Sequence, residues 1–214
     1  MASVTRSAEV LRILERYLVE VVERYELCPW ARTTREHGEL AAGILWGTPS
    51  LDAWVAEVER LLAVPSARVV MVIAPELAIS REALGAVRDR VAARIPSAGV
   101  AEFHPTAALD LATAARLVPF LRRSPDPLLQ LVPLSLIHAA REAARTGSPA
   151  AGLAQQATML GGHAASPRTG LTERIAAGNH ATVAEAHAAI TAIFEAIAAD
   201  RRAAYARAGI TGSR

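Results

Sequence analysis

The chain opens with the hydrophobic spacing of an amphipathic helix. Apolar side chains recur every three or four residues over residues 7–26, and Ser7 precedes them as a suitable N-cap. Pro29 disfavours helical angles at Cys28 and cannot itself continue the hydrogen-bond ladder. We therefore predict a helix over residues 7–26 that leaves Cys28 at its C-terminal end.

Short apolar runs then alternate with helical periodicity. Three runs have the composition of strands, and the second is typical of a strand buried on both faces: residues 40–46, 68–74 and 99–104. Two helices are expected between them, from Ser50 or Asp52 to Val64 and from Ser80 to Ile95. The pattern predicts an α-rich α/β fold, with a small three- to four-stranded sheet, at least one crossover unit and a covering of helices.

After Pro105 the pattern changes to helix and loop. Prolines interrupt apolar turns, so we expect a bent connection over residues 122–127 before a helix over residues 134–145. A Gly-, Ala- and Ser-rich stretch and a long alanine-rich helix follow, the latter as a C-terminal extension. The expected organisation is a compact α/β domain over 1–145, a loop or lid over 146–180, and a helix within 181–214 packed on the same domain.

Composition narrows the function classes. All 23 basic residues are arginine, which excludes a lysine Schiff base, a pyridoxal phosphate anchor and a phosphate-loop lysine. A net charge of +2 without a basic stripe argues against a nucleic-acid partner. The single cysteine excludes an intramolecular disulfide and an iron–sulfur cluster, and no signal peptide or membrane span is evident. We expect a cytoplasmic protein with no membrane partner.

Cys28 and the pair Glu102 and His104 are the candidate catalytic residues. Cys28 is either a buried small hydrophobe or a nucleophile that needs a base nearby. Glu102 and His104 lie two residues apart on an expected strand, so they share one face and Phe103 takes the other. Pro105 ends that strand, so we expect His104 at the rim of the sheet, as an acid/base group or as a histidine bonded to a loop carbonyl.

Metal or haem binding is an alternative role for the histidines. The residue types allow a site made of Glu102 and His104 with His163 and His180, although no spacing selects it. The Cys-Pro pair at Cys28 is weak evidence for haem. His187 falls on the apolar stripe of the last helix and is expected to be a core histidine.

Four residues are candidates for binding an anionic substrate. Arg123, together with Arg122, precedes a proline-stiffened turn and is suited to clamping a carboxylate or phosphate, or else lies on the surface. Ser124 and Asn179 are the polar candidates beside them. The glycines of residues 161–170 fit a flexible loop better than a phosphate cradle.

Three segments together resemble the uncharacterised bacterial family known as DUF1415. These are residues 26–31 (ELCPWA), similar to the family's N-L-C-P-F-A, 102–105 (EFHP), similar to its S-F-H-P, and 123–129 (RSPDPLL), similar to its R-S-P-Y-P-x-L. A weaker similarity covers residues 179–183. The resemblance implies a compact α/β domain that brings Cys28, His104 and Arg123 towards one pocket, and it implies no particular reaction.

The chain departs from that family after the proline motif. The family continues with L-H-L-L-R-E, whereas the positions of its His, Arg and Glu are here Gln130, Pro133 and Leu134. Three functions stay open. The first is an enzyme acting on a small anionic substrate, with His104 as acid or base, Arg123 as clamp and Cys28 as possible nucleophile. The others are a metal- or haem-binding protein, and an inert relative that acts as an interaction module, for which the long C-terminal helix could supply a homodimer face.

Overall fold

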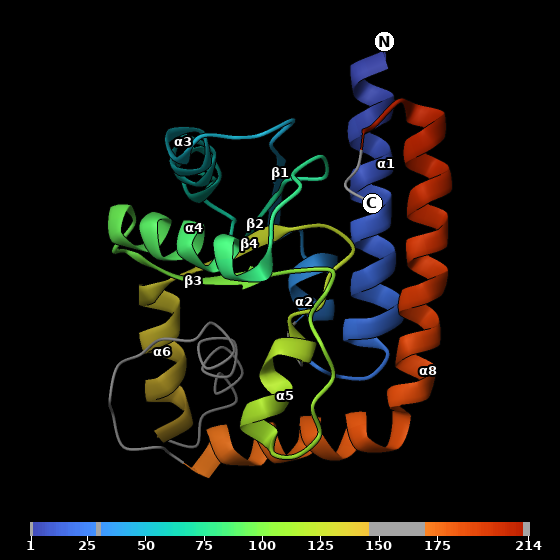
Figure 1. Cartoon of the computed structure of the whole chain (residues 1–214). Coiled ribbons are helices and arrows are strands. Elements are labelled where there is room, and N and C mark those ends of the chain that lie inside the picture. Colours follow the sequence, from blue (N-terminus) through green and yellow to red (C-terminus); the bar gives the residue numbers. More distant parts are fainter. Residues whose placement is uncertain (1, 29–30, 146–169, 212–214) are drawn as a thin grey trace.

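The structure, a computed structural model, describes residues 2–28, 31–145 and 170–211. A four-stranded mixed sheet lies at its centre in the order β1-β2-β4-β3 (Figure 1). The strands are β1 (Leu40–Ile44), β2 (Val69–Ile73), β3 (Ala98–Phe103) and β4 (Leu128–Pro133). β1 and β2 are parallel, and β4 runs antiparallel to both of its neighbours. The α-rich α/β fold with a small crossover sheet is confirmed.

β4 is the one strand that the sequence analysis did not predict. It enters the sheet between β2 and β3, and all of its residues except Pro133 are buried. Pro127 and Pro133 lie at the two ends of this segment, so its sequence resembles apolar turns that are interrupted by prolines. Pro133 is tolerated because it is the last residue of the strand, where a missing N–H breaks little of the ladder.

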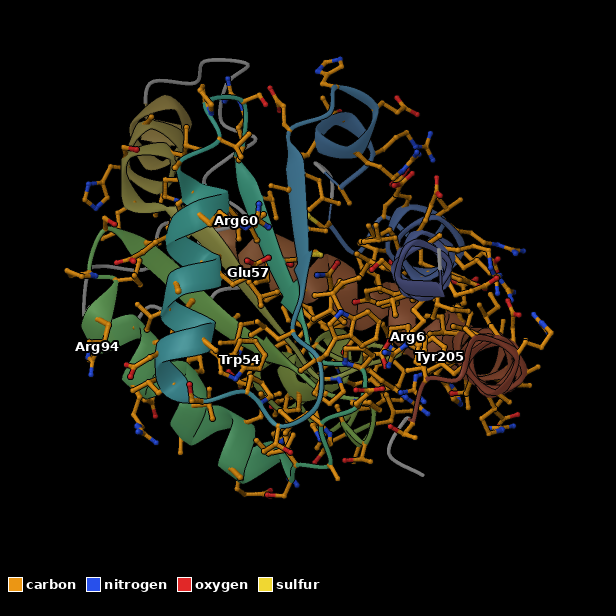
Figure 2. All side chains as sticks on the ribbon, turned by 90° about the horizontal axis from the view of Figure 1, so that it is seen from above. Arg6, Trp54, Glu57, Arg60, Arg94 and Tyr205 are labelled. Carbon is orange, nitrogen blue, oxygen red and sulfur yellow. The ribbon has the colours of Figure 1, made fainter. Side chains whose placement is uncertain are left out.

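Two helices cover one face of the sheet, α3 (Leu51–Leu62) and α4 (Arg81–Arg94). Ser50 and Ser80 cap them, each accepting a hydrogen bond from the backbone N–H three residues ahead, as the sequence predicted. Trp54 is 1% exposed and points from α3 towards the sheet (Figure 2). It packs in a core with alternate residues of the inner strands, including Val70, Val72 and Leu129.

The other face of the sheet carries the larger core. Its helices are α1 (Ala2–Tyr17), the π-helix η1 (Leu18–Glu23), α5 (Ala114–Leu121) and α8 (Gly170–Ala208). Figure 1 shows α1 and α8 running side by side beyond one end of the sheet. Tyr17 and Phe120 pack on Phe194 of α8, with ring centroids 6.0 and 6.1 Å away. The long C-terminal helix therefore belongs to the same packed body.

The expected helix over residues 7–26 ends in a wider π-helical turn. η1 follows α1 directly, and Glu26 then adopts a left-handed φ of 52° that reverses the chain. Leu27 closes this reversal by donating its N–H to the carbonyl of Val22. π-helical turns are rare and are frequent at functional sites. This one places Cys28 beyond the helix end, and α2 (Ala31–Glu36) follows.

Ion pairs fasten α8 to α1. Asp200 accepts hydrogen bonds from the Arg12 and Arg16 guanidinium groups at 2.6 to 3.0 Å. These two arginines lower the pKa of Asp200. The contribution of a partly exposed pair is modest, about 0.2–1 kcal/mol each.

We expect Asp200→Asn to lower the free energy of unfolding by about 1 kcal/mol at pH 7, because it removes both ion pairs. A carboxyl whose pKa is lowered in the folded state stabilises the fold above its ordinary pKa, and that stabilisation is lost as the pH falls. The difference between wild type and Asp200→Asn should therefore be constant from about pH 5 to 8 and shrink steadily as the pH falls below about 4. Urea titrations across this range measure it, and a difference that grows on acidification would contradict the assignment.

The region after β4 agrees in part with the expected organisation. α6 (Leu134–Arg145) begins and ends where the sequence predicted. α8 begins at Gly170, so residues 170–180 of the expected loop or lid are helical, and residues 146–169 lie outside the described residues. Within the described chain, one helix, Ala176–Ala208, is long and apolar enough by length and composition to cross a membrane, and 22% of its window is buried. Cytoplasmic location without a membrane partner stays a prediction.

Candidate functional site

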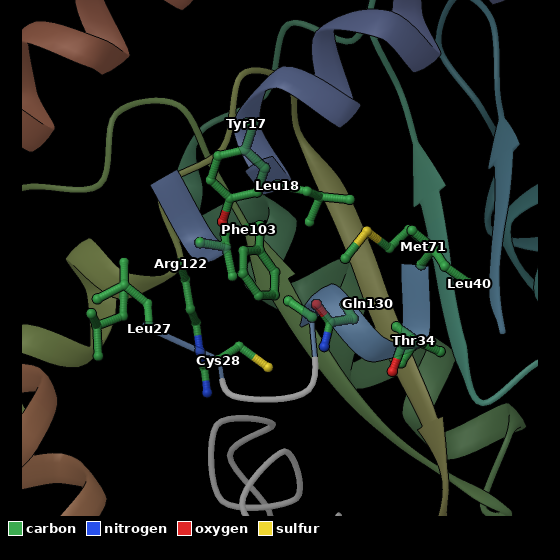
Figure 3. A pocket seen from close by; sticks show the side chains of 14 residues that line it. Tyr17, Leu18, Leu27, Cys28, Thr34, Leu40, Met71, Phe103, Arg122 and Gln130 are labelled. Atoms are coloured by element: carbon green, nitrogen blue, oxygen red, sulfur yellow. The ribbon is translucent and has the colours of Figure 1, made fainter. Parts of the chain in front are cut away.

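An apolar cavity opens between the sheet and the turn that follows η1. The space between its lining residues, counted together with the open solvent at its mouth, amounts to about 710 Å³ (Figure 3). Its apolar walls come from the helices and turn, Tyr17, Leu18, Val22, Leu27 and Leu121, and from the strands, Leu40, Val69, Met71 and Phe103. The π-helical turn thus forms one side of this cavity, with Leu18 and Val22 on its wall.

Gln130 brings an amide into the apolar cavity. It lies in the middle of β4, between Leu129 and Leu131, and is 8% exposed. Among the described residues, no hydrogen bond from its side chain is present. A buried amide that lacks partners costs about 1–3 kcal/mol, so such a group points to a ligand or to water that pairs with it.

Thr34 contributes a hydroxyl from α2 to the same cavity. Its residue is 5% exposed, and within the described ranges its side chain has no hydrogen-bond partner. Thr34 and Gln130 lie near each other in Figure 3. Together they form a small polar patch inside a largely apolar cavity, which is the usual composition of a small-molecule site.

Cys28 and Arg122 lie at another side of the cavity (Figure 3). The Arg122 side chain is 13% exposed. Burial lowers the pKa of Arg122, and the negative charge of Glu102 acts in the opposite direction. The cavity therefore holds a permanent cation and a potential nucleophile.

Asn179 positions the turn that carries Cys28. Its side-chain amide, 6% exposed, donates a hydrogen bond to the carbonyl of Leu27 at 3.3 Å. α8 thereby holds the residue that precedes the thiol. The structure gives Asn179 a positioning contact instead of the substrate contact that the sequence analysis expected.

A second, polar hollow lies on the other face of β3. Its lining residues are Arg81, Glu102, His104, Ala107, Val118, Pro119 and Arg122. Glu102 and His104 share this side while Phe103 faces the apolar cavity, as their alternation along the strand predicted. Arg122 borders both spaces.

His104 is held by hydrogen bonds at both ring nitrogens. Nδ1 accepts from the Thr106 backbone N–H at 3.2 Å, so Nε2 carries the proton that it donates to the Ile79 carbonyl at 2.9 Å. The residue is 5% exposed. His104 follows β3 directly and lines the polar hollow, as expected for the rim of the sheet, and its hydrogen bond fits the loop-carbonyl alternative. An acid/base role would require breaking these bonds.

The family resemblance implied a single pocket for Cys28, His104 and Arg123, and this expectation is wrong. Cys28 lines the apolar cavity and His104 the polar hollow, while Arg123 lines neither. The Arg123 guanidinium instead lies 4.7 Å from the ring centroid of Phe194, a cation–π contact with α8. Its neighbour Arg122 is the arginine that faces the cavities.

Ser124 is a turn residue in this structure. It is 2% exposed, and its hydroxyl donates to the backbone carbonyl of Asp126 at 2.6 Å. The expected substrate contact of Ser124 is replaced by this internal bond, which shapes the proline turn. This proline turn places Asp126 against α8.

The histidines outside the hollow are dispersed. The Nε2 of His180 bonds the Leu111 carbonyl at 2.8 Å. His187 is exposed, so its expected place in the core is wrong. Within the described part of the chain, no group of three or more His, Cys, Asp or Glu is placed to hold a metal. His163 lies outside the described residues, so the composite metal site, like haem binding, stays a prediction.

No family model, curated protein or solved structure matches this chain. The resemblance to DUF1415 therefore stays a prediction. Its motifs supply residues to both cavities, Cys28 and Phe103 to one and His104 to the other. Sequence reasoning missed Thr34 as a site residue and treated Gln130 only as a departure from the family. The signal available for Gln130 was a lone amide in an otherwise apolar run.

Proposed function

We propose that the chain binds a small, mostly apolar carboxylate in the apolar cavity. The observation that carries this proposal is Gln130, a buried amide without a described partner, facing an apolar space beside a buried arginine. Arg122 supplies the charge that a carboxylate needs. Gln130 and Thr34 supply hydrogen bonds, and the surrounding aliphatic and aromatic walls favour an apolar body.

The position of Cys28 leads us to propose a catalysed reaction in addition to binding. Its thiol lies in the same cavity as the cation, which is the environment that activates a cysteine. His104 is engaged on the other side of β3 and takes no part. The enzyme that we propose therefore depends on Cys28 and Arg122, with the apolar cavity selecting the substrate.

The test compares ligand binding in wild type and Gln130→Met, which removes the amide and keeps an unbranched side chain. Calorimetric titration uses benzoate, phenylacetate and hexanoate, with benzyl alcohol as the uncharged comparison. We expect wild type to bind at least one carboxylate with a dissociation constant of about 0.1–1 mM, given the small number of ligand atoms. Gln130→Met should weaken that binding about tenfold.

The same variant should be more stable than wild type without ligand. Removing an unsatisfied buried amide relieves a desolvation penalty, so the free energy of unfolding should rise by about 1 kcal/mol. Thr113→Val, which changes the N-cap of α5 away from the cavity, is the control and should leave carboxylate binding unchanged. Loss of stability in Gln130→Met, with binding intact, would contradict the site.

The reactivity of the Cys28 thiol gives an independent measure of whether a ligand occupies the apolar cavity. A bound carboxylate fills the space around the thiol, so saturating ligand should slow alkylation of wild-type Cys28 by iodoacetamide several-fold. Because Cys28 is the single cysteine, mass spectrometry reports on this thiol alone. Equal rates with and without a ligand that binds calorimetrically would place that ligand elsewhere.

A further inference from the structure

The polar hollow has a charge arrangement of which the proposed carboxylate site uses only Arg122. Glu102 of β3 meets two guanidinium groups, with Arg88 Nη1 at 3.1 Å and Arg122 Nη1 at 3.5 Å. Arg81, at the start of α4, lines the hollow together with Arg122, whereas Arg88 contacts Glu102 from outside the lining. One carboxylate therefore pairs with two cations, and a third cation shares the lining with it.

The acidic residues near this cluster do not fill the hollow. Asp89 pairs with Arg88 from a side chain that is 70% exposed. Glu82 caps the first turn of α4 with Ser80 and is fully exposed to solvent. Inside the hollow, Glu102 remains the one carboxylate among the described lining residues, so an excess of positive charge is left beside the mostly buried Arg122.

Repulsion between the three cations reveals the same excess. After burial, which is the largest cause, Arg88 and Arg81 each lower the pKa of Arg122, against the effect of Glu102. An anion that enters the hollow would be attracted by the charges of Arg81 and Arg122 together, where little water screens them. Arg81 is exposed and forms no ion pair with another described residue, so its side chain is available to close on such an anion.

We propose that the polar hollow is a second binding site, for a tetrahedral oxyanion such as a phosphate group. Guanidinium groups bind phosphate through paired N–H donors, and two arginines from different elements surround it better than one. His104, held by hydrogen bonds to Thr106 and Ile79, forms part of the wall of the hollow. This site is separate from the proposed carboxylate site and lies on the opposite face of β3.

The test uses inorganic phosphate as the probe, at pH 7.5 and constant ionic strength maintained with chloride. Calorimetry and phosphorus NMR line widths are recorded for the full chain as wild type, Arg81→Gln, Arg88→Gln and Arg94→Gln. Arg94 is the matched control, since it lies on α4 with a 57% exposed side chain outside the hollow. We expect phosphate binding in wild type and Arg94→Gln, and an affinity at least about tenfold lower in Arg81→Gln, whose side chain lines the hollow. Arg88→Gln, which acts only through Glu102, should cause a smaller loss.

The outcomes separate the two proposals. Gln130→Met should leave phosphate binding unchanged, and Arg81→Gln should leave carboxylate binding unchanged, because each residue lines one space only. Failure of wild type to bind phosphate, or equal losses in Arg94→Gln and Arg81→Gln, would overturn the oxyanion site and leave the carboxylate site standing. Circular dichroism confirms that each variant is folded.

Discussion

Replacing Arg201 by Met should lower the free energy of unfolding by about 3–5 kcal/mol. Arg201 of α8 pairs with Asp126 of the proline turn, with Nε 2.7 Å from Oδ1, and it also donates to the Pro75 carbonyl at 3.0 Å. Both residues are buried, 8% and 3% exposed. Removing one partner of a buried pair leaves an uncompensated charge in the interior, which accounts for the large expected loss.

The second oxygen of Asp126 accepts a hydrogen bond from the Tyr205 hydroxyl at 2.6 Å. Burial raises the pKa of Asp126, and the contacts with Arg201 and Tyr205 lower it. The carboxylate thus depends on these two partners. α8 is thereby attached to the turn that leads into β4.

Urea unfolding of matched variants tests this pair. Arg202→Met, on the exposed side of α8 next to Arg201, should change stability by less than about 0.5 kcal/mol. The double variant Asp126→Asn with Arg201→Met should recover part of the loss, because it removes the stranded charge and keeps an acceptor for Tyr205. A cost below about 1 kcal/mol for Arg201→Met alone would contradict the assigned role.

Arg122→Met should weaken binding at both proposed sites. Arg122 borders the apolar cavity and the polar hollow, and its guanidinium is the one cation shared by their linings. Hydrogen bonds to charged groups contribute about 1.5–3 kcal/mol, so carboxylate affinity should fall by about 10- to 150-fold. Phosphate affinity should fall together with it.

The comparison with Arg122→Lys identifies the cause. Lysine keeps the positive charge and loses the planar fork, so it should restore only part of either affinity. Arg123→Met is the neighbouring control, because Arg123 lies over Phe194 and faces neither space. If Arg123→Met reduced ligand binding as much as Arg122→Met does, the assignment of Arg122 to the two sites would be wrong.

Local signals predicted the elements of this fold better than their arrangement. Ser50 and Ser80 begin α3 and α4 as expected, since a cap acts on a backbone N–H only three residues away. β4 was missed because its partners are β2 and β3, and the pairing that makes it a strand lies outside its own sequence. The π-helical turn of η1 was not predicted either, because the spacing of apolar residues indicates a helix without indicating its type.

The site was predictable in its residue types and not in its geometry. Alternation along β3 correctly separated Phe103 from Glu102 and His104. The sequence named both Arg122 and Arg123 as candidates, because which of two adjacent arginines faces the cavities depends on how α5 ends and on where α8 packs. The Nε2 of His104 bonds the carbonyl of Ile79, a contact between residues 25 positions apart that no sequence motif predicted.

The pairing of α1 with α8 has a consequence for how the protein is made. Asp200 and Arg12 are 188 residues apart in the sequence, so this interface joins segments that leave the ribosome far apart in time. Contacts between distant segments form slowly, because a long loop must lose conformational entropy before these contacts can stabilise the fold. Until α8 has been synthesised, the apolar residues of α1 lack their cover, and the nascent chain is then most exposed to aggregation and most in need of chaperones.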